Sequence, residues 1–225
     1  MKSYFIKEGY NCNLTPQGNR IEQYKTIPNN APYQVACYQY AAALMKQNGW
    51  ERCLELGSGS GFKLDKYIRP VAQRVVGIDL PHAVEYCKKM YPGIEWLSDD
   101  FDSPQAALPE PFDLIISFDV IEHLINPELL LKKIKQYASP FTKILISTPE
   151  RDLLNGKDNF GPPHNKLHVR EWNQEELKQF LLSEGFSIEM LKILDARKLT
   201  IKQQISQFLG RVNYKTCQLY ECSYK

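Results

Sequence analysis

The sequence predicts an α/β fold in which a doubly wound, mostly parallel sheet carries helices on both faces. Short apolar runs alternate with helical patterns from residue 31 to residue 195, as expected of consecutive βα units. The runs at 74–79, 112–118 and 143–147 are almost continuously apolar, which is typical of parallel strands that are covered on both sides. With 225 residues the chain is long enough to bury the core of one domain.

The helices and strands can be placed in order from apolar periodicity and from their end signals. Proline stands in the first turn of three expected helices, where its missing N–H breaks no hydrogen bond. The last helix has a capping pair, Asn173 and Glu176, and is followed by Gly185. Helices are expected at 31–48, 62–68, 81–90, 127–137 and 174–183. Strands are expected at 53–56, 74–79, 94–97, 112–118, 143–147, 186–194 and 216–224.

Two segments stand apart from this alternation. Residues 1–30 are polar and interrupted by glycine and proline, which indicates an N-terminal arm or lid in front of a single domain at 31–225. The connection at 197–215 is too long for a hairpin. It predicts an inserted basic amphipathic helix, which either packs on the domain or contacts an anionic surface or a partner. Its apolar residues share one helical face: Ile201, Ile205, Phe208, Leu209 and Val212.

Composition narrows the class of protein. The net charge of +2 gives no electrostatic reason to expect a nucleic acid as partner. The six cysteines include no C-x-x-C pair, so we expect reduced, mostly buried thiols rather than disulfides or a zinc site. No apolar run resembles a signal peptide or approaches the length of a membrane span, and we therefore expect a cytoplasmic protein. The oligomeric state stays open, with a homodimer as one option.

A glycine-rich turn at residues 57–61 predicts a ligand site. It follows an apolar strand and precedes a helix, so that free N–H groups and side-chain-free backbone can approach an anionic or nucleotide-bearing ligand. Dinucleotide sites require G-x-G-x-x-G, but Phe62 occupies the position of the third glycine. The pattern here is E-x-G-x-G-x-G, and the carboxylate of Glu55 would repel a pyrophosphate while suiting an ammonium group.

Further carboxylates follow the next strands. Asp79 ends the second strand, where a carboxylate can accept hydrogen bonds from both hydroxyls of a ribose. Dehydrogenases and methyltransferases share this feature, and an aspartate at this position also commonly caps a helix. Asp99, Asp100 and Phe101 follow the third strand, where a carboxylate can accept from an adenine amine and the phenyl ring can pack on the base.

Together these motifs resemble those of the class I S-adenosylmethionine-dependent methyltransferases over about residues 50–195. The segment 112–124 is similar to the family signature F-D-L-I-x-x-x-x-V-I-E-H-L. The resemblance implies a seven-stranded Rossmann-like sheet whose last strand is antiparallel, and S-adenosyl-L-methionine as cofactor. It implies that backbone carbonyls near Ser117 and Phe118 receive the methionine ammonium. The cofactor residues so implied are Glu55, Gly57, Ser58, Gly59, Gly61, Asp79, Leu80, Asp100, Phe101, Ser117 and Phe118.

Histidines are the candidate catalytic groups, because a general base assists transfer to oxygen and imidazole titrates in the useful range. His123 follows the fourth strand beside Glu122, where the pair can also simply cap the next turn. His164 and His168 lie after the fifth strand, in the region that lines the acceptor pocket in the family. We favour one of these two as the base over His123, with Glu150 and Arg151 facing the acceptor. Their H-x-x-x-H spacing would suit zinc on a helix, but the neighbouring prolines favour a loop, and no metal is expected.

The sequence therefore predicts transfer of a methyl group from S-adenosylmethionine to a small-molecule or saccharide-type acceptor, with oxygen as the favoured atom. One alternative is a nucleotide-dependent oxidoreductase on a similar sheet, against which Phe62 argues. The other is a methyltransferase-like module that binds without catalysing. The identity of the acceptor cannot be derived from the sequence.

Overall fold

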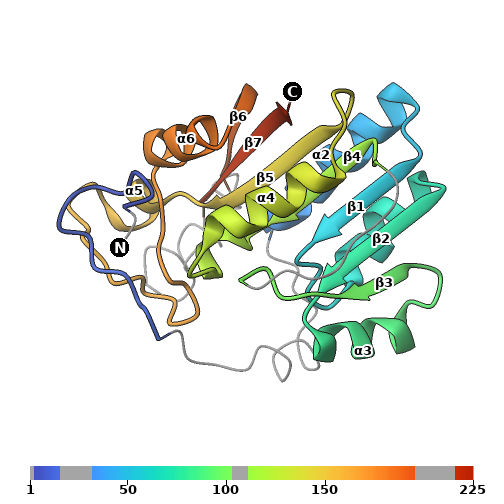
Figure 1. Cartoon of the computed structure of the whole chain (residues 1–225), viewed down its shortest axis with the longest axis horizontal. Helices are drawn as coiled ribbons and strands as arrows, with labels where there is room; N and C mark the ends of the chain where they lie inside the picture. Colours follow the sequence, from blue (N-terminus) through green and yellow to red (C-terminus); the bar gives the residue numbers. More distant parts are fainter. Residues whose placement is uncertain (1–2, 16–31, 103–110, 196–215, 225) are drawn as a thin grey trace, which may run out of the picture.

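A seven-stranded sheet forms the centre of the molecule, with helices on both faces (Figure 1). The computed structural model describes residues 3–15, 32–102, 111–195 and 216–224. The strand order is β3-β2-β1-β4-β5-β7-β6, and only β7 runs against the others, paired antiparallel with both β5 and β6. The strands are β1 (Arg52–Leu56), β2 (Arg74–Asp79), β3 (Glu95–Ser98), β4 (Leu114–Phe118), β5 (Lys143–Pro149), β6 (Phe186–Asp195) and β7 (Thr216–Tyr224).

The helices begin and end close to the expected residues. Asn173 and Glu176 form the capping box at the start of α6, with Asn173 accepting from the Glu176 N–H at 2.9 Å. The α-helices are α2 (Pro32–Asn48), α3 (Pro81–Met90), α4 (Pro127–Tyr137), α5 (Arg151–Asn155) and α6 (Gln174–Ser183). Shorter π and 3-10 segments are η1 (Leu64–Ile68), η2 (Arg69–Val71) and η3 (Ile121–His123).

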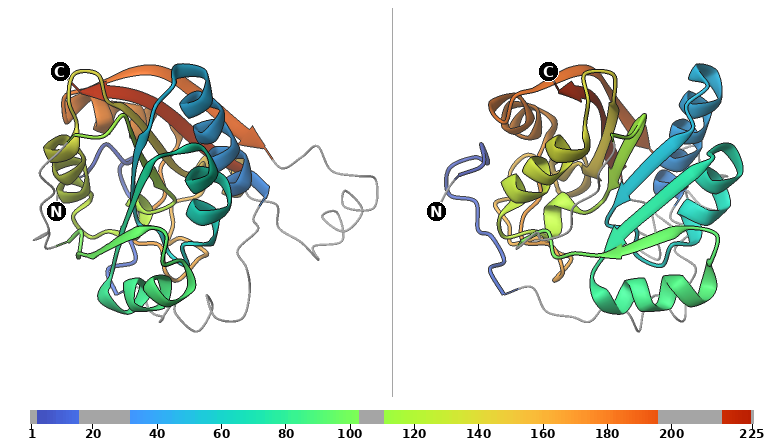
Figure 2. Two further views of the ribbon diagram at one scale, coloured as in Figure 1. Left: turned by 90° about the vertical axis from the view of Figure 1, so that its right-hand side faces the viewer. Right: turned by 45° about the vertical axis from the view of Figure 1, so that its right-hand side comes forward.

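Helices cover both faces of the sheet (Figure 2), and an apolar core lies beneath them on each face. On one face, α4 and α6 pack on β1, β2, β4 and β5 through side chains such as Leu131, Ile134 and Phe180. On the other face, α2, η1 and α3 pack through Met45, Leu64 and Val84. Because both faces are covered, the central strands are buried along almost their whole length, which explains their continuous apolar sequences.

The strand order places a topological switch point between β1 and β4. The chain leaves β1 toward β2 and β3, then returns to the other side of β1 as β4. In open α/β sheets, ligands bind outside the carboxyl ends of the strands at such a point. The glycine turn after β1 and the segment after β4 therefore face the same crevice.

The main differences from the expected elements are local. The short helix α5 was not predicted, because five residues leave little periodicity to detect. The expected helix at 62–68 contains the π segment η1. The predicted basic helix at 197–215 and the second half of the N-terminal arm lie outside the described residues. None of the described helices is both long and apolar enough to cross a membrane.

Candidate functional site

The glycine turn packs tightly against the end of β4. Gly57 donates to the carbonyl of Ile78 at 2.8 Å, and its φ of +87° lies in the region that favours glycine. A Cβ atom at Gly57 would lie 2.2 Å from Cγ2 of Val120. The turn therefore tolerates no side chain at this position, and its close contact with Val120 places it directly beside the segment that follows β4.

Asp79 lies at the same edge of the sheet. Its Oδ2 accepts from the N–H of Gly59 and its Oδ1 from the N–H of Leu80, both at 2.7 Å. The carboxylate is thus oriented by the glycine turn on one side and by the start of α3 on the other. Each of these two hydrogen bonds uses one lone pair of an oxygen that carries two. A ribose contact by the Asp79 carboxylate stays a prediction.

Glu55 is fully buried at the end of β1. The Tyr38 hydroxyl donates to Oε1 of Glu55. Burial raises the pKa of the Glu55 carboxyl from 4.5 to about 7, and the Tyr38 hydrogen bond and the Lys63 charge limit the rise. Burial also lowers the pKa of Lys63, whose Nζ donates to Oε1 of Gln34 at 2.7 Å. No sequence pattern indicated this tyrosine, lysine and glutamine, which come from α2 and from the end of the turn.

The end of β4 is connected to the same group. Ser117 donates to the carbonyl of Leu56 at 3.1 Å, and the Phe118 ring lies edge-on to Tyr38 with 5.1 Å between centroids. Asp119 has a φ of +56° and accepts from Nε2 of Gln34 at 2.5 Å. The residues predicted to contact the methionine part of the cofactor are therefore brought together, with an additional carboxylate at Asp119.

The acidic pair after β3 divides into one buried and one exposed residue. Asp99 forms a buried ion pair with Lys133 at 2.9 Å, whereas Asp100 is exposed to solvent. Phe101 is almost completely buried in the core on the α4 face. Of the two aspartates, only Asp100 is accessible to solvent, and its role in ligand binding stays a prediction.

These residues fit S-adenosylmethionine. The turn leaves space only for backbone at Gly57, which suits a ligand that lies directly on the main chain. Glu55 presents a buried carboxyl group that could receive the ammonium group, and the Asp79 carboxylate lies where it could accept from ribose hydroxyls. When bound, the cofactor supplies an activated methyl group on a sulfonium, so that the chain has only to bind and orient the reactants.

A second polar group lies after β4 and contains His123 and His168. The two rings are edge-on, with 4.5 Å between centroids. Nδ1 of His123 lies 2.8 Å from the carbonyl oxygen of Leu167, and Nδ1 of His168 lies 2.6 Å from Oε1 of Glu171. The Nε2 atoms of both rings face Oε1 of Glu122, at 3.7 Å and 3.9 Å respectively.

A small pocket, partly open to solvent, adjoins this second group. It is lined by Pro149, Leu154, Asn155, His164, Asn165, His168 and Glu171. His164 is exposed on the pocket, whereas His168 is buried at its base. His164 and His168 therefore border one pocket but do not share a helix face, as expected for a loop, whereas His123 does not line it. Glu171 was not among the predicted residues, although its position three residues after His168 offered a weak signal.

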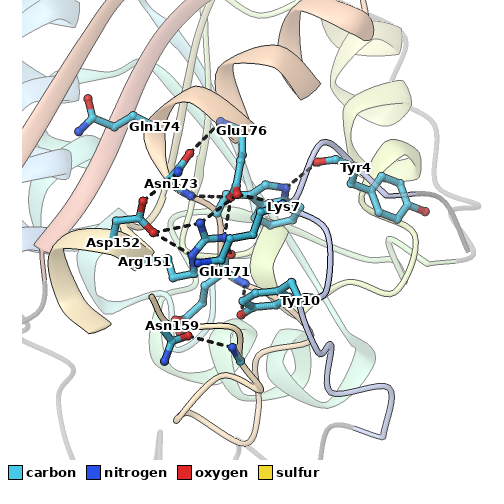
Figure 3. Close-up of polar contacts among 12 residues, drawn as sticks. Tyr4, Lys7, Tyr10, Arg151, Asp152, Asn159, Glu171, Asn173, Gln174 and Glu176 are labelled. Atoms are coloured by element: carbon cyan, nitrogen blue, oxygen red, sulfur yellow. Dashed lines mark hydrogen bonds and ion pairs between the residues drawn. The ribbon is translucent and has the colours of Figure 1, made fainter. Parts of the chain in front are cut away.

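The prediction that Glu150 and Arg151 face the acceptor is wrong. Glu150 is buried and caps α5 by accepting from the Leu153 N–H at 2.6 Å. Arg151 is buried and forms two hydrogen bonds with Glu176, at 2.6 and 2.9 Å (Figure 3). The polar atoms of both side chains are hydrogen-bonded within the protein. Burying a charged group without such partners would cost free energy.

The described part of the N-terminal arm lies along the loop that contains His164 and His168 (Figure 3). Asn11 and Asn13 donate from the backbone to the carbonyls of Phe160 and Val169, both at 2.8 Å. Trp172 donates from Nε1 to the carbonyl of Tyr4 at 3.0 Å. Residues 3–15 are thus hydrogen-bonded to this loop.

Comparisons with known proteins agree with the fold. A methyltransferase-domain family model matches residues 30–191. A probable S-adenosylmethionine-dependent methyltransferase of Mycolicibacterium smegmatis is 34% identical over 141 residues, covering 60% of this chain and 52% of the relative. A ubiquinone biosynthesis O-methyltransferase of Bradyrhizobium diazoefficiens is 24% identical over 144 residues, covering 61% and 56%. The chain thus spans about half the length of these curated relatives.

The fold itself recurs in solved structures. The magnesium protoporphyrin IX methyltransferase of Synechocystis PCC 6803, with bound SAH, aligns at a TM-score of 0.61 and 13% identity, covering 93% of this chain and 89% of the other. At this identity the similarity concerns the fold alone. The sheet order, the glycine turn and the extent of the family match agree with one another. The chain therefore belongs to the methyltransferase-domain family, in the class I fold whose cofactor is S-adenosylmethionine.

Proposed function

We propose that this protein transfers the methyl group of S-adenosylmethionine to a hydroxyl oxygen of a small-molecule or saccharide-type acceptor. The observation that carries the proposal is the glycine turn, which lies against the end of β4 and is bordered by the carboxylates of Glu55 and Asp79. The family match supports the methyl donor. The name of the B. diazoefficiens relative supports oxygen as the acceptor atom.

The cofactor would lie across the carboxyl ends of β1, β2 and β4. Its ammonium group would be received by Glu55 and by the carbonyls near Ser117 and Phe118, and its ribose hydroxyls by Asp79. Asp100 would accept from the adenine amine, with Phe101 supporting the base from the core side. The N–H groups of Ser58, Gly59 and Gly61 belong to the turn that approaches the ligand.

Replacing Asp79 by alanine is expected to weaken binding of S-adenosylhomocysteine by about 1–3 kcal/mol, because charged hydrogen bonds to the ribose are lost. This corresponds to roughly 5- to 150-fold in affinity, measured by titration calorimetry. Asp65→Ala is the matched control, since Asp65 forms only a partly exposed pair with Arg69. No binding of S-adenosylhomocysteine to the unmodified protein at millimolar concentration would contradict the proposed function.

The acceptor would occupy the pocket beside His123 and His168. Both imidazoles present Nε2 toward Glu122, and the pocket is lined largely by polar side chains that suit hydroxylated ligands. We propose that these two histidines activate the acceptor oxygen. His164, which is exposed on the pocket, would contact the acceptor rather than its reacting atom.

Variants of the histidines test this assignment. His123→Ala and His168→Ala are expected to lower turnover by about 10²–10⁴-fold, the usual contribution of such groups, with affinity for S-adenosylhomocysteine retained. His82→Ala is the control, because His82 is exposed at the start of α3. Turnover is followed with radiolabelled S-adenosylmethionine on extract fractions that contain the acceptor. Unchanged turnover in both variants would reject the assignment.

A further inference from the structure

The tautomer of the neutral His123 ring follows from its hydrogen bond. Its Nδ1 lies 2.8 Å from the carbonyl oxygen of Leu167, which can only accept. Nδ1 must therefore carry the proton. In the neutral ring, the lone pair lies on Nε2, the atom that is 3.7 Å from Oε1 of Glu122.

His168 is held in the same tautomer by two partners. Asn165 accepts from the Leu167 N–H through Oδ1 at 3.1 Å, which orients its amide so that Nδ2 faces Nε2 of His168 at 2.8 Å. Since the amide nitrogen donates, Nε2 accepts, and Nδ1 donates to the carboxylate of Glu171 at 2.6 Å. The lone pair of this ring also lies on Nε2, which is 3.9 Å from Oε1 of Glu122.

Three electron-pair donors therefore face one point. The ligand atoms of Glu122, His123 and His168 all lie within 4.8 Å of one another. The Glu122 side chain is fully buried, and those of His168 and His123 are only 4% and 15% exposed. Two imidazole nitrogens and one carboxylate oxygen are thereby grouped around a common centre, which is the arrangement of a metal-binding site.

We propose that Glu122, His123 and His168 bind a divalent transition-metal ion of the zinc type. Two imidazoles and one carboxylate match the ligand set of catalytic zinc sites and differ from the all-oxygen sets of magnesium and calcium. Metal–ligand bonds of about 2.1 Å in a tetrahedron separate the ligand atoms by roughly 3.4 Å. The two histidine nitrogens lie 3.7 and 3.9 Å from Oε1 of Glu122, a few tenths of an ångström beyond this separation, and all three ligand atoms lie within 4.8 Å of one another.

The surroundings have the features of an outer shell. Metal-bound histidines usually donate their second N–H to a carbonyl or carboxylate, as His123 does to Leu167 and His168 to Glu171. Glu122 also accepts from the Thr148 hydroxyl through Oε2 at 2.9 Å, which leaves Oε1 directed at the histidines. Asn165 competes with the ion for the His168 lone pair, so its amide has to turn away when the ion binds.

The chemical use of the ion rests on the proposed function, although its binding does not. With the acceptor hydroxyl at a fourth position, the ion would lower the pKa of that hydroxyl, so that the two histidines would activate the oxygen through the ion and the proton would pass to water. The oxygen would then bond to the methyl carbon as the carbon–sulfur bond breaks. The sulfonium and the alkoxide would become a thioether and a methyl ether, which balances both atoms and charge.

The test uses the full-length chain, freed of metal with a chelator, and Zn²⁺ alone as the probe in titration calorimetry. One ion per chain is expected to bind. His123→Ala and His168→Ala should each weaken binding by more than about 100-fold, since even outer-shell changes cost 10- to 100-fold. Asn165→Ala should tighten binding, because the competing amide is removed. His82→Ala and His164→Ala are the matched controls and should leave affinity unchanged.

Absence of zinc binding at millimolar ion, or equal affinity in wild-type, His123→Ala and His168→Ala proteins, would overturn the site. Near-ultraviolet circular dichroism verifies that each variant is folded, and His123→Ala, at the more exposed ligand, provides the safer reading. Binding of S-adenosylhomocysteine is measured in parallel without metal. If S-adenosylhomocysteine binds but zinc does not, only the proposed metal site is contradicted. If zinc binds but S-adenosylhomocysteine does not, only the proposed function is contradicted.

Discussion

Replacing Arg151 by methionine is expected to lower the free energy of unfolding by about 3–5 kcal/mol, the usual cost of removing one partner of a buried ion pair. The Arg151 side chain is fully buried, and its guanidinium bonds Glu176 twice and the carbonyl of Glu171 at 3.2 Å (Figure 3). Methionine keeps much of the apolar volume, so the loss reports mainly on the Glu176 carboxylate that is left buried. Urea unfolding followed by circular dichroism measures the change.

The control for Arg151 is Arg69→Met. Arg69 pairs with Asp65 across one helical turn at 2.5 Å, but its side chain is about half exposed. Exposed pairs of this kind contribute about 0–1 kcal/mol. A loss below about 1 kcal/mol in Arg151→Met would show that the pair does not stabilise the fold.

The position of Glu176 makes this result informative about the acceptor side of the site. Its carboxylate also accepts from the backbone N–H groups of Asn173 and Lys7, both at 3.0 Å. One side chain therefore connects α5, the start of α6 and the N-terminal arm. Loss of Arg151 is expected to disturb the loop that holds His168 before it affects the glycine turn.

Replacing Glu55 by glutamine is expected to remove a pH dependence of stability between about pH 4.5 and pH 7. Burial raises the pKa of the folded carboxyl from 4.5 to about 7. Within this window the folded state holds a proton that the unfolded state has released, so the free energy of unfolding falls as pH rises. The total change is about 3 kcal/mol at 1.36 kcal/mol per pKa unit. Denaturant unfolding at several pH values measures it.

The difference between wild-type and Glu55→Gln stability should therefore grow in favour of the variant from pH 4.5 to pH 7 and stay constant above it. Glutamine retains an oxygen that can accept from Tyr38, so packing is little changed. A difference that does not vary with pH would show that the carboxyl is ionised normally. The cofactor's ammonium group favours the ionised form, so S-adenosylhomocysteine affinity for the wild type should rise across pH 7.

Local sequence signals were sufficient to predict most of the helices and strands. The ends of α3, α4 and α6 and of β2 agree with those expected, because proline at a helix start and the capping box act within a few residues. The antiparallel β7 followed from resemblance to the family and is confirmed. The cysteines are free, and five of the six are buried, as their apolar surroundings indicate.

Periodicity along short stretches of sequence was enough to predict the fold class, and the glycine spacing together with the resemblance of neighbouring motifs to a family was enough to predict the cofactor. The roles of charged and titratable side chains became visible only in the folded protein. Arg151 is a buried structural group, and His168 pairs with Glu122 and His123, which are more than 40 residues away along the chain. Burial and hydrogen-bond partners set the protonation and charge of such groups, and both depend on segments that meet only when the sheet and its loops have formed.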